Sequence, residues 1–128
     1  MPAATGSTIT IIGQIAVNVT DMDRAVAFYR DVIGLPFLFQ PGPNLAFFQC
    51  GDVRLMLDIP EDERFAGKAS VIYYKVADIE KAFDDIKGRG AEVEGEPHVV
   101  AKMPDHELWM AFFKDTEGNF FSIMSEVR

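Results

Sequence analysis

The residues best suited to acid–base chemistry lie at and near the two histidines of the chain, His98 and His106. His106 stands between two acidic residues, Asp105 and Glu107. Histidine titrates near neutral pH and is the usual general base, so His98, His106 and Glu107 are candidate catalytic residues. The alternative is a solvated loop between strands, because proximity in sequence does not bring side chains into one cavity. With Asp105, the same residues would supply the ligands of an atypical metal site.

Three other side chains have functional and structural interpretations. Arg54 could hold a carboxylate or phosphate through two parallel hydrogen bonds, or it could be an ordinary surface arginine. Trp109 could stack against a ligand, or it could pack in the core or at a dimer interface. Cys50 is the single cysteine, so it cannot form an internal disulfide, and a small buried hydrophobe is its usual role. The sequence contains no nucleophile motif, phosphate-binding loop or dinucleotide fingerprint.

Composition and charge narrow the classes of function. The 128 residues suffice for one domain, spanning 1–128, and 48% of them are hydrophobic. Twenty acidic residues against 12 basic ones give a net charge of −8. This charge repels phosphate backbones and anionic membrane surfaces, so neither nucleic acid nor membrane is expected as a partner, whereas a cationic small molecule would be tolerated. There is no signal peptide and no apolar run of about 18 residues, which predicts a cytoplasmic protein.

An internal repeat indicates which elements position these side chains. Residues 19–25 and 76–82 align without a gap and match in order a valine, an aspartate, an apolar residue, an acid, a base and an alanine. Each segment follows an alternating strand pattern, at 14–19 and 71–76. Thr20 or Asp21 in the first copy, and Asp78 in the second, can cap the helix that comes next.

Three short strands are predicted after each helix. They span 37–40, 45–50 and 53–59 in the first copy, and 92–94, 107–114 and 119–125 in the second, where 98–101 extends the first of them. The pattern predicts an α+β domain of two βαβββ repeats that form curved mixed sheets around a concave cavity. The repeats cover about 9–60 and 69–126, and residues 60–68 link them.

Two stretches of this sequence resemble a known family. The run from Gln14 to Leu35, which contains Val-Asn-Val-Thr-Asp-Met-Asp-Arg-Ala, is similar to the opening of vicinal oxygen chelate proteins. Residues 113–123 resemble their closing strand–turn–strand. The likeness covers about 9–126 and implies membership of the glyoxalase, bleomycin-resistance and extradiol-dioxygenase superfamily, with its glyoxalase-like fold. That superfamily contains isomerases, epimerases, dioxygenases, thiol transferases and drug-sequestering proteins, so the resemblance implies a small-molecule function without specifying one reaction.

The resemblance also locates the positions that bind metal in metal-dependent members. These correspond to Gln14 and Val71 on the first strands and to Met56 and Ser122 on the last strands, with Arg54 as the register alternative to Met56. None of these residues is a histidine or a carboxylate, the donors that divalent ions need. The resemblance therefore implies no family-type metal site, and no cofactor is expected.

Strand alternation indicates which side chains face the concave cavity. Gln14 and Asn18 should point away from the helix-covered side, and Tyr73, Phe120 and Ser122 should do so in the second repeat. A surface of phenyl, thioether, amide and hydroxyl groups suits an organic ligand better than an ion. The predicted ligand-binding residues are Gln14, Asn18, Arg54, Met56, Tyr73, Trp109, Phe120 and Ser122.

Three functions are compatible with these features. A metal-independent lyase, isomerase or epimerase would use acid–base chemistry at Gln14, His98, His106 or Glu107, and this reading is slightly favoured. A binding protein would sequester an antibiotic or another aromatic or cationic compound. A metal-dependent lyase or dioxygenase would use atypical ligands. A curved sheet that a helix covers on one side only leaves its edge strands and apolar surface exposed. Pairing of two chains would cover them, so a homodimer is also expected.

Overall fold

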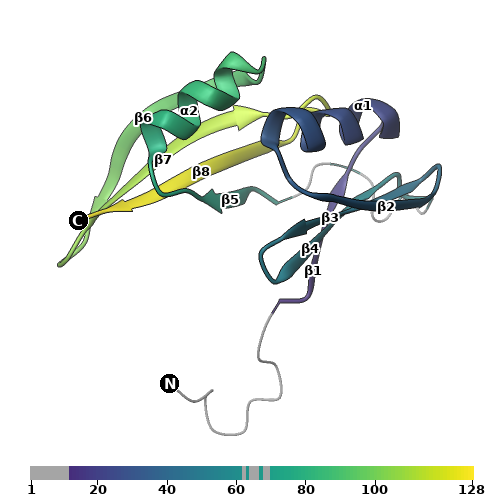
Figure 1. Ribbon diagram of the computed structural model, residues 1–128, viewed down its shortest axis with the longest axis horizontal. Helices are drawn as coiled ribbons and strands as arrows, with labels where there is room; N and C mark the ends of the chain where they lie inside the picture. Colours follow the sequence, from purple (N-terminus) through teal and green to yellow (C-terminus); the bar gives the residue numbers. More distant parts are fainter. Residues whose placement is uncertain (1–11, 62, 64–66, 68–69) are drawn as a thin grey trace, which may run out of the picture.

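The computed structural model describes residues 12–61, 63, 67 and 70–128. Two units with the same order of elements, a strand, a helical segment and three strands, follow one another along the chain (Figure 1). The first unit contains β1 (Gln14–Asn18), α1 (Met22–Ala27), the π-helix η1 (Phe28–Ile33), β2 (Phe37–Gly42), β3 (Leu45–Cys50) and β4 (Val53–Asp58). The second contains β5 (Ile72–Lys75), α2 (Ile79–Gly88), β6 (Glu92–Lys102), β7 (Glu107–Lys114) and β8 (Phe120–Val127). The predicted α+β class with two βαβββ repeats is confirmed.

Each unit builds a four-stranded mixed sheet with the same connectivity. The strand orders are β1-β4-β3-β2 and β5-β8-β7-β6. In each sheet the first strand pairs in parallel with the last, and the remaining pairs are antiparallel. The helices α1 and α2 both lie on one side of the sheets (Figure 1). We call this side the convex side and the opposite surfaces of the two sheets the concave faces.

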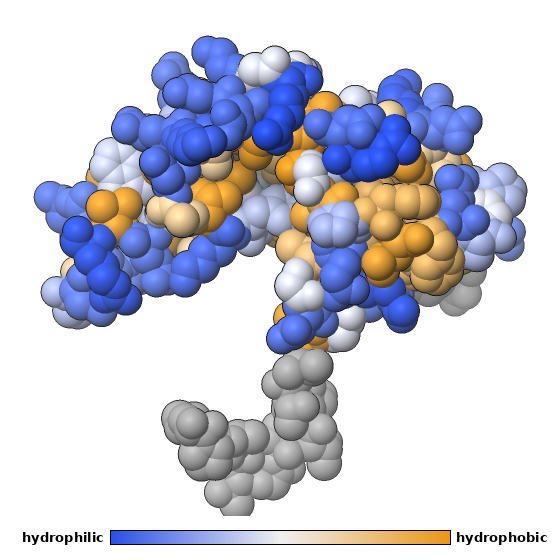
Figure 2. All heavy atoms as spheres, viewed as in Figure 1, coloured by the Kyte–Doolittle hydropathy of each residue, from blue (hydrophilic) through white to orange (hydrophobic). Residues whose placement is uncertain are grey.

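Alternation along the strands separates core residues from concave ones, as the sequence predicted. In the first sheet Val17, Phe48 and Leu57 lie in the core with at most 2% exposure, while Gln14 and Arg54 are exposed. One apolar cluster spans both units, for example through the ring contact of Phe28 with Phe121 at 6.0 Å. The space-filling view shows an open hollow between the two units on the side away from the helices (Figure 2). None of the described helices is long and apolar enough to cross a membrane.

The first helix differs from the sequence-based expectation in its second half. It begins as predicted, with the Asp21 side chain accepting a hydrogen bond from Arg24 N at 3.1 Å. From Phe28 onward it widens into a π-helix, and it ends at Gly34, whose φ of 88° lies in the left-handed region that favours glycine. The consecutive side chains of Phe28 and Tyr29 in this segment are both buried.

A turn of the second unit closes the start of the first helix. Glu117, in the β7–β8 turn, has a fully buried side chain whose Oε1 accepts hydrogen bonds from the backbone N–H groups of Thr20 and Asp21, each at 2.9 Å. Its Oε2 accepts from Arg24 Nε at 2.8 Å. Burial alone would raise the pKa of Glu117, but these bonds outweigh it and hold the pKa well below its ordinary value. Glu117 thus joins the two units.

A buried hydroxyl and an amide make further bonds across the same junction. Tyr29 donates its hydroxyl hydrogen to Asp115 Oδ2 at 2.7 Å, and Asn119 Nδ2 donates to Asn18 O at 2.9 Å. Asp115 and Asn119 are both buried, so these bonds are shielded from water. The orientation of one unit relative to the other is therefore set by specific polar contacts as well as by apolar packing.

Strand β6 is longer than the sequence suggested. The sequence predicted a strand at 92–94 that residues 98–101 extend, and the structure has one continuous strand, Glu92–Lys102. Its pairing with β7 shifts register at several points, including around Gly95 and Pro97. Proline has no N–H to donate, so the strand continues past it only with an irregularity. One of these shifts places His98 opposite Met110.

Candidate functional site

A cationic side chain, Arg54, lies on the concave face of the first sheet, near the start of the inner strand β4. Arg54 pairs in register with Gln14 on β1, and its Nε donates to Gln14 Oε1 at 2.9 Å. The Gln14 amide in turn donates to the Met56 sulfur at 3.6 Å. The guanidinium carbon of Arg54 lies 5.2 Å from the centroid of the Phe47 ring, a cation–π contact. We call Gln14, Phe47, Arg54 and Met56 the Arg54 cluster.

Strand pairing explains why these four side chains meet. β4 is hydrogen-bonded to β1 on one side and to β3 on the other, and Met56 pairs in register with Phe47. Three predicted site residues, Gln14, Arg54 and Met56, are thus brought together. Phe47 was not predicted, although its position next to the core residue Phe48 in an alternating strand was a usable signal. The ring of Phe39 on β2 extends the cluster, with its centroid 4.9 Å from that of Phe47.

The concave face of the second sheet carries an aromatic group. Tyr73 on β5 meets Phe112 on β7 edge to face at 6.3 Å, and the His98 ring lies 6.3 Å from the same phenyl ring. The Nδ1 atom of His98 lies 2.7 Å from Glu96 O. A carbonyl oxygen can only accept, so Nδ1 carries the hydrogen and Nε2 of the neutral ring is left as an acceptor. We call Tyr73, His98 and Phe112 the Tyr73 cluster.

Ser122 lies on the predicted face, but its side chain is buried and its hydroxyl is bonded to the backbone. Its register position lies between Tyr73 and Phe112. Its hydroxyl donates to Ala111 O at 2.8 Å. Strand alternation correctly predicted the sheet face on which Ser122 lies. The burial of its side chain depends on residues of the neighbouring strands, which alternation does not describe. Phe120 remains accessible at 39% exposure, and the Lys114 ammonium lies 5.2 Å from its ring centroid.

Asn18 lies at the junction of the two units, away from the Arg54 cluster. Its Nδ2 donates to Gly67 O at 2.9 Å. It borders a pocket of about 450 Å³ that also includes Thr20, Ile59, Glu117 and Asn119. The predicted linker, residues 60–68, contributes Pro60 and Gly67 to this pocket, and residues 62, 64–66 and 68 lie outside the described part of the chain.

The two predicted catalytic histidines do not come together. His106 lies in the turn between β6 and β7, where its Nδ1 is 2.7 Å from Asp105 Oδ1. Arg128 donates to the other carboxylate oxygen of Asp105, also at 2.7 Å. The hydrogen bonds from Arg128 and His106 lower the pKa of Asp105. Asp105 and Arg128 thus form a surface ion pair at the end of the second sheet, and His106 contacts the same carboxylate.

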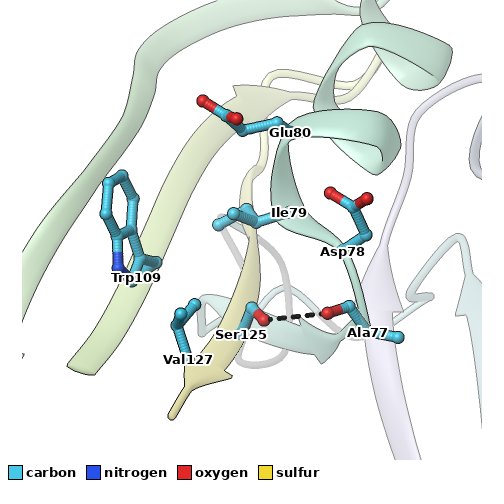
Figure 3. Close-up of a pocket in the computed structure, with 7 residues that line it drawn as sticks. All are labelled: Ala77, Asp78, Ile79, Glu80, Trp109, Ser125 and Val127. Atoms are coloured by element: carbon cyan, nitrogen blue, oxygen red, sulfur yellow. Dashed lines mark hydrogen bonds between the residues drawn. The ribbon is translucent and has the colours of Figure 1, made fainter. Parts of the chain in front are cut away.

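Glu107, a candidate catalytic residue, and Trp109, a candidate ligand contact, lie on the convex side, away from the concave faces. Trp109 has the strand parity of the core residues Ala111 and Phe113, and its Nε1 donates to Glu107 Oε1 at 3.2 Å. Its ring forms one wall of a pocket of about 360 Å³ at the start of α2 (Figure 3). Ile79 and Glu80 line the opposite wall. Trp109 is thus separated from His98 by the sheet itself.

Another cavity, of about 220 Å³, lies between the units on the convex side. Cys50, Tyr74, Ile86 and Ile123 are among its lining residues. Burial raises the pKa of the Cys50 thiol, and it also raises the pKa of the Tyr74 phenol. The Tyr74 hydroxyl is buried and has no hydrogen-bond partner among the described residues. Cys50 is half-buried, close to the expected role of a small hydrophobe.

The donors at the family's metal positions do not fit a divalent ion. Gln14 is engaged with Arg54 and Met56, the Ser122 hydroxyl is bonded to the backbone, and Val71 has no donor atom. The guanidinium at Arg54 would also repel a metal cation placed beside Gln14. Of the atypical set, Asp105 and His106 are in contact, whereas His98 lies on the concave face and Glu107 on the convex side. In the part of the chain that the structure describes, no three histidine, cysteine, aspartate or glutamate side chains gather around a possible metal position.

Comparison with known proteins gives consistent matches along almost the whole chain. The family profile described as Glyoxalase/Bleomycin resistance protein/Dioxygenase superfamily matches residues 11–123. The uncharacterized protein YraH of Bacillus subtilis (strain 168) is 29% identical over an alignment of 126 positions, and the match takes in 86% of this chain and 94% of YraH.

Two solved structures illustrate the range of functions found on this fold. A lactoylglutathione lyase from Agrobacterium tumefaciens is similar with a TM-score of 0.72 and 24% identity, covering 91% of this chain and 94% of the lyase. TnmS3, an antibiotic binding protein from Streptomyces sp. CB03234, is similar with a TM-score of 0.74 and 22% identity, covering 94% of this chain and 98% of TnmS3. One is named for a reaction and the other for binding. At these identities the likeness is one of fold.

Proposed function

Since the chain belongs to the glyoxalase/bleomycin resistance protein/dioxygenase superfamily, we propose that it binds a small, mainly apolar organic molecule on its concave faces without a metal ion. The observation that carries this proposal is the makeup of those faces. They present aromatic rings and a thioether with a few polar anchors: Phe47 and Met56 with the Arg54 guanidinium on the first sheet, and Tyr73 and Phe112 on the second. Pockets for organic molecules have this composition.

Binding is favoured over catalysis by the placement of the candidate acid–base residues. His98 lies on the concave face, His106 is at the end of the second sheet, and Glu107 is on the convex side. General acid–base catalysis requires groups within hydrogen-bond reach of the same reacting atoms. The three side chains do not share such a position.

A metal-independent reaction is the second candidate, because one observation favours it. His98 donates a hydrogen bond from Nδ1 to Glu96 O, so in the neutral ring Nε2 is the hydrogen-bond acceptor. A single histidine fixed in this tautomer can act as a general base. If turnover of a ligand is found, His98→Gln should abolish turnover and leave binding in place. Activity that persists in this variant would refute the catalytic role.

The proposal includes a homodimer, because the exposed apolar surface is extensive. Phe37, Leu38, Phe39 and Tyr73 are between 39% and 49% exposed. The described strands show no pairing between the two sheets, so β1 and β5 each pair with a neighbour on one side only. Pairing of two chains would cover such edges and apolar side chains. A second chain would also bring another pair of concave faces within reach of the ligand.

A ligand screen with matched variants tests the binding proposal. Thermal shift against a library of aromatic and aliphatic compounds should identify a stabilising compound, and titration calorimetry should then give its affinity. Gln14→Leu and Tyr73→Ala should weaken binding by on the order of tenfold, as expected for the loss of one useful contact. The control is Trp109→Phe on the convex side, which should not change the affinity. Unchanged affinity in both concave variants would refute the proposal.

A further inference from the structure

We infer that the ligand of the concave faces carries a carboxylate group, which the guanidinium of Arg54 binds. The inference rests on the proposed function and adds the chemical class of the ligand. It follows from how Arg54 is held, from what surrounds it, and from how the other basic side chains of the chain are used.

The guanidinium of Arg54 is oriented by its neighbours while its terminal amino groups stay available. Gln14 accepts the Nε hydrogen, and the guanidinium carbon lies over the Phe47 ring. Among the described residues, no protein atom accepts a hydrogen bond from Nη1 or Nη2. These two groups donate in the parallel geometry that a carboxylate accepts. A guanidinium already held in one orientation loses less conformational entropy when it binds an anion.

Most other cations whose contacts are described already have a carboxylate partner. Salt bridges join Arg24 to Glu117, Arg30 to Asp31, Lys75 to Glu126, Lys81 to Asp85 and Arg128 to Asp105. No described carboxylate lies within salt-bridge distance of Arg54, in a chain with 20 acidic and 12 basic residues. Its register partners on the two neighbouring strands are amides, Gln14 and Gln49. Arg54 thus sits in a row of neutral polar groups.

The overall negative charge does not prevent an anion from binding at this position. Charges farther away than about 8 Å are largely screened at physiological ionic strength. Asp52, in the turn two residues before Arg54, forms no salt bridge with it, and Asp58 lies four residues along β4, roughly 13 Å away at about 3.3 Å per residue. The contact with the guanidinium therefore dominates the local interaction. The net charge of −8 is expected to slow the approach of an anion more than it weakens the bound state.

The surroundings of Arg54 also indicate the rest of the ligand. The ring centroids of Phe39 and Phe47 lie 4.9 Å apart, with Phe47 beside the guanidinium. Met56, the register partner of Phe47, adds a further apolar side chain. A flat aromatic group can lie against these side chains while its carboxylate reaches Nη1 and Nη2. The compound class is therefore an aromatic carboxylate, in which the charged and the apolar parts are adjacent.

A pair of probes that differ only in charge tests this inference. Binding of 2-naphthoate and of its neutral analogue 2-naphthamide to the full chain is measured by titration calorimetry at low ionic strength. We expect the naphthoate to bind at least tenfold more tightly than the amide. Arg54→Met should remove this preference, and Arg54→Lys should retain part of it, because lysine keeps the charge without the paired donors. Raising the salt concentration should weaken binding of the naphthoate only.

Lys87→Met provides the matched control. Lys87 also lies over a phenyl ring, 5.8 Å from the centroid of Phe83, but on helix α2 of the convex side. Its loss should leave both affinities unchanged, and the melting temperature of each variant verifies folding. Equal affinities of the two probes that Arg54→Met does not change would overturn the inference. If Tyr73→Ala weakened both probes in that case, the proposed binding function would stand. Failure of both probes to bind at millimolar concentration would also overturn the inference, while the library screen would still test the function.

Discussion

Replacing Glu117 with glutamine should destabilise the protein by about 2 kcal/mol at pH 7. The glutamine retains one carbonyl oxygen. The backbone N–H groups of Thr20 and Asp21 therefore keep a hydrogen-bond acceptor, but this acceptor is neutral instead of charged. A hydrogen bond to a charged group contributes about 1.5–3 kcal/mol, against about 0.5–1.5 kcal/mol for a neutral one, so each of the two bonds loses roughly 1 kcal/mol. Arg24 is half exposed, and its ion pair is left out of this figure.

The loss in the free energy of unfolding is measured by urea denaturation, with circular dichroism as the signal. The midpoint should fall with an unchanged slope, and the melting temperature of this 128-residue chain should fall by about 7 °C, given about 2.1 cal/mol/K of unfolding entropy per residue. The pKa of Glu117 is lower in the folded chain than its ordinary value of 4.5. Its charge therefore stabilises the fold above about pH 4.5, and this contribution is lost as the pH falls further. The difference between wild type and variant should shrink accordingly.

Glu126→Gln is the control for the loss of one negative charge. Glu126 forms a looser surface ion pair with Lys75 at 3.4 Å, so its replacement should change stability by less than about 0.5 kcal/mol. An equal effect of the two substitutions would refute the reasoning, because net charge alone would then explain both. A Glu117→Gln effect that did not change between pH 7 and pH 4 would refute it as well.

Three further measurements test the fold and the site. Gly34→Ala should destabilise the protein by about 1–2 kcal/mol, because Gly34 has a φ of 88°, whereas Gly88→Ala at the end of α2 should be neutral or slightly stabilising. Metal analysis of protein purified without a histidine tag should find far less than one equivalent of zinc, nickel or iron, and one equivalent that disappears on substitution of His98 or His106 would contradict the metal-free site. Sedimentation at micromolar concentration should show a dimer, and a monomer at all concentrations would contradict the proposed pairing.

The main elements and faces of the fold could be predicted because they follow from short-range patterns. The repeat marked both strand–helix junctions, and Asp21 and Asp78 cap the helices as expected. Alternation placed Gln14 on the concave face, and the family resemblance pointed to Met56 or Arg54 on the neighbouring strand, which is why part of the Arg54 cluster was found. Trp109 could have been placed by the same rule, since it alternates in step with Ala111 and Phe113 of the core.

The remaining features depend on contacts that no local pattern specifies. The burial of Ser122 requires knowledge of Tyr73 and Phe112 on the strands beside it. The position of His98 depends on the register shifts of β6, which alternation does not reveal. The role of Glu117 depends on partners 93 to 97 residues earlier in the chain. Sequence could thus give the faces of the strands, but not the contacts made across the two units.

The capping of the first helix by Glu117 also affects how the protein folds during its synthesis. The ribosome makes the chain from the N-terminus, so α1 leaves the exit tunnel long before Glu117 has been added. Until then the N–H groups of Thr20 and Asp21 have only water to bond with, and Tyr29 lacks Asp115 as its acceptor. The N-terminal half therefore cannot reach its final stability as a nascent fragment. The native fold can be completed only after the turn before the last strand, β8, has been translated.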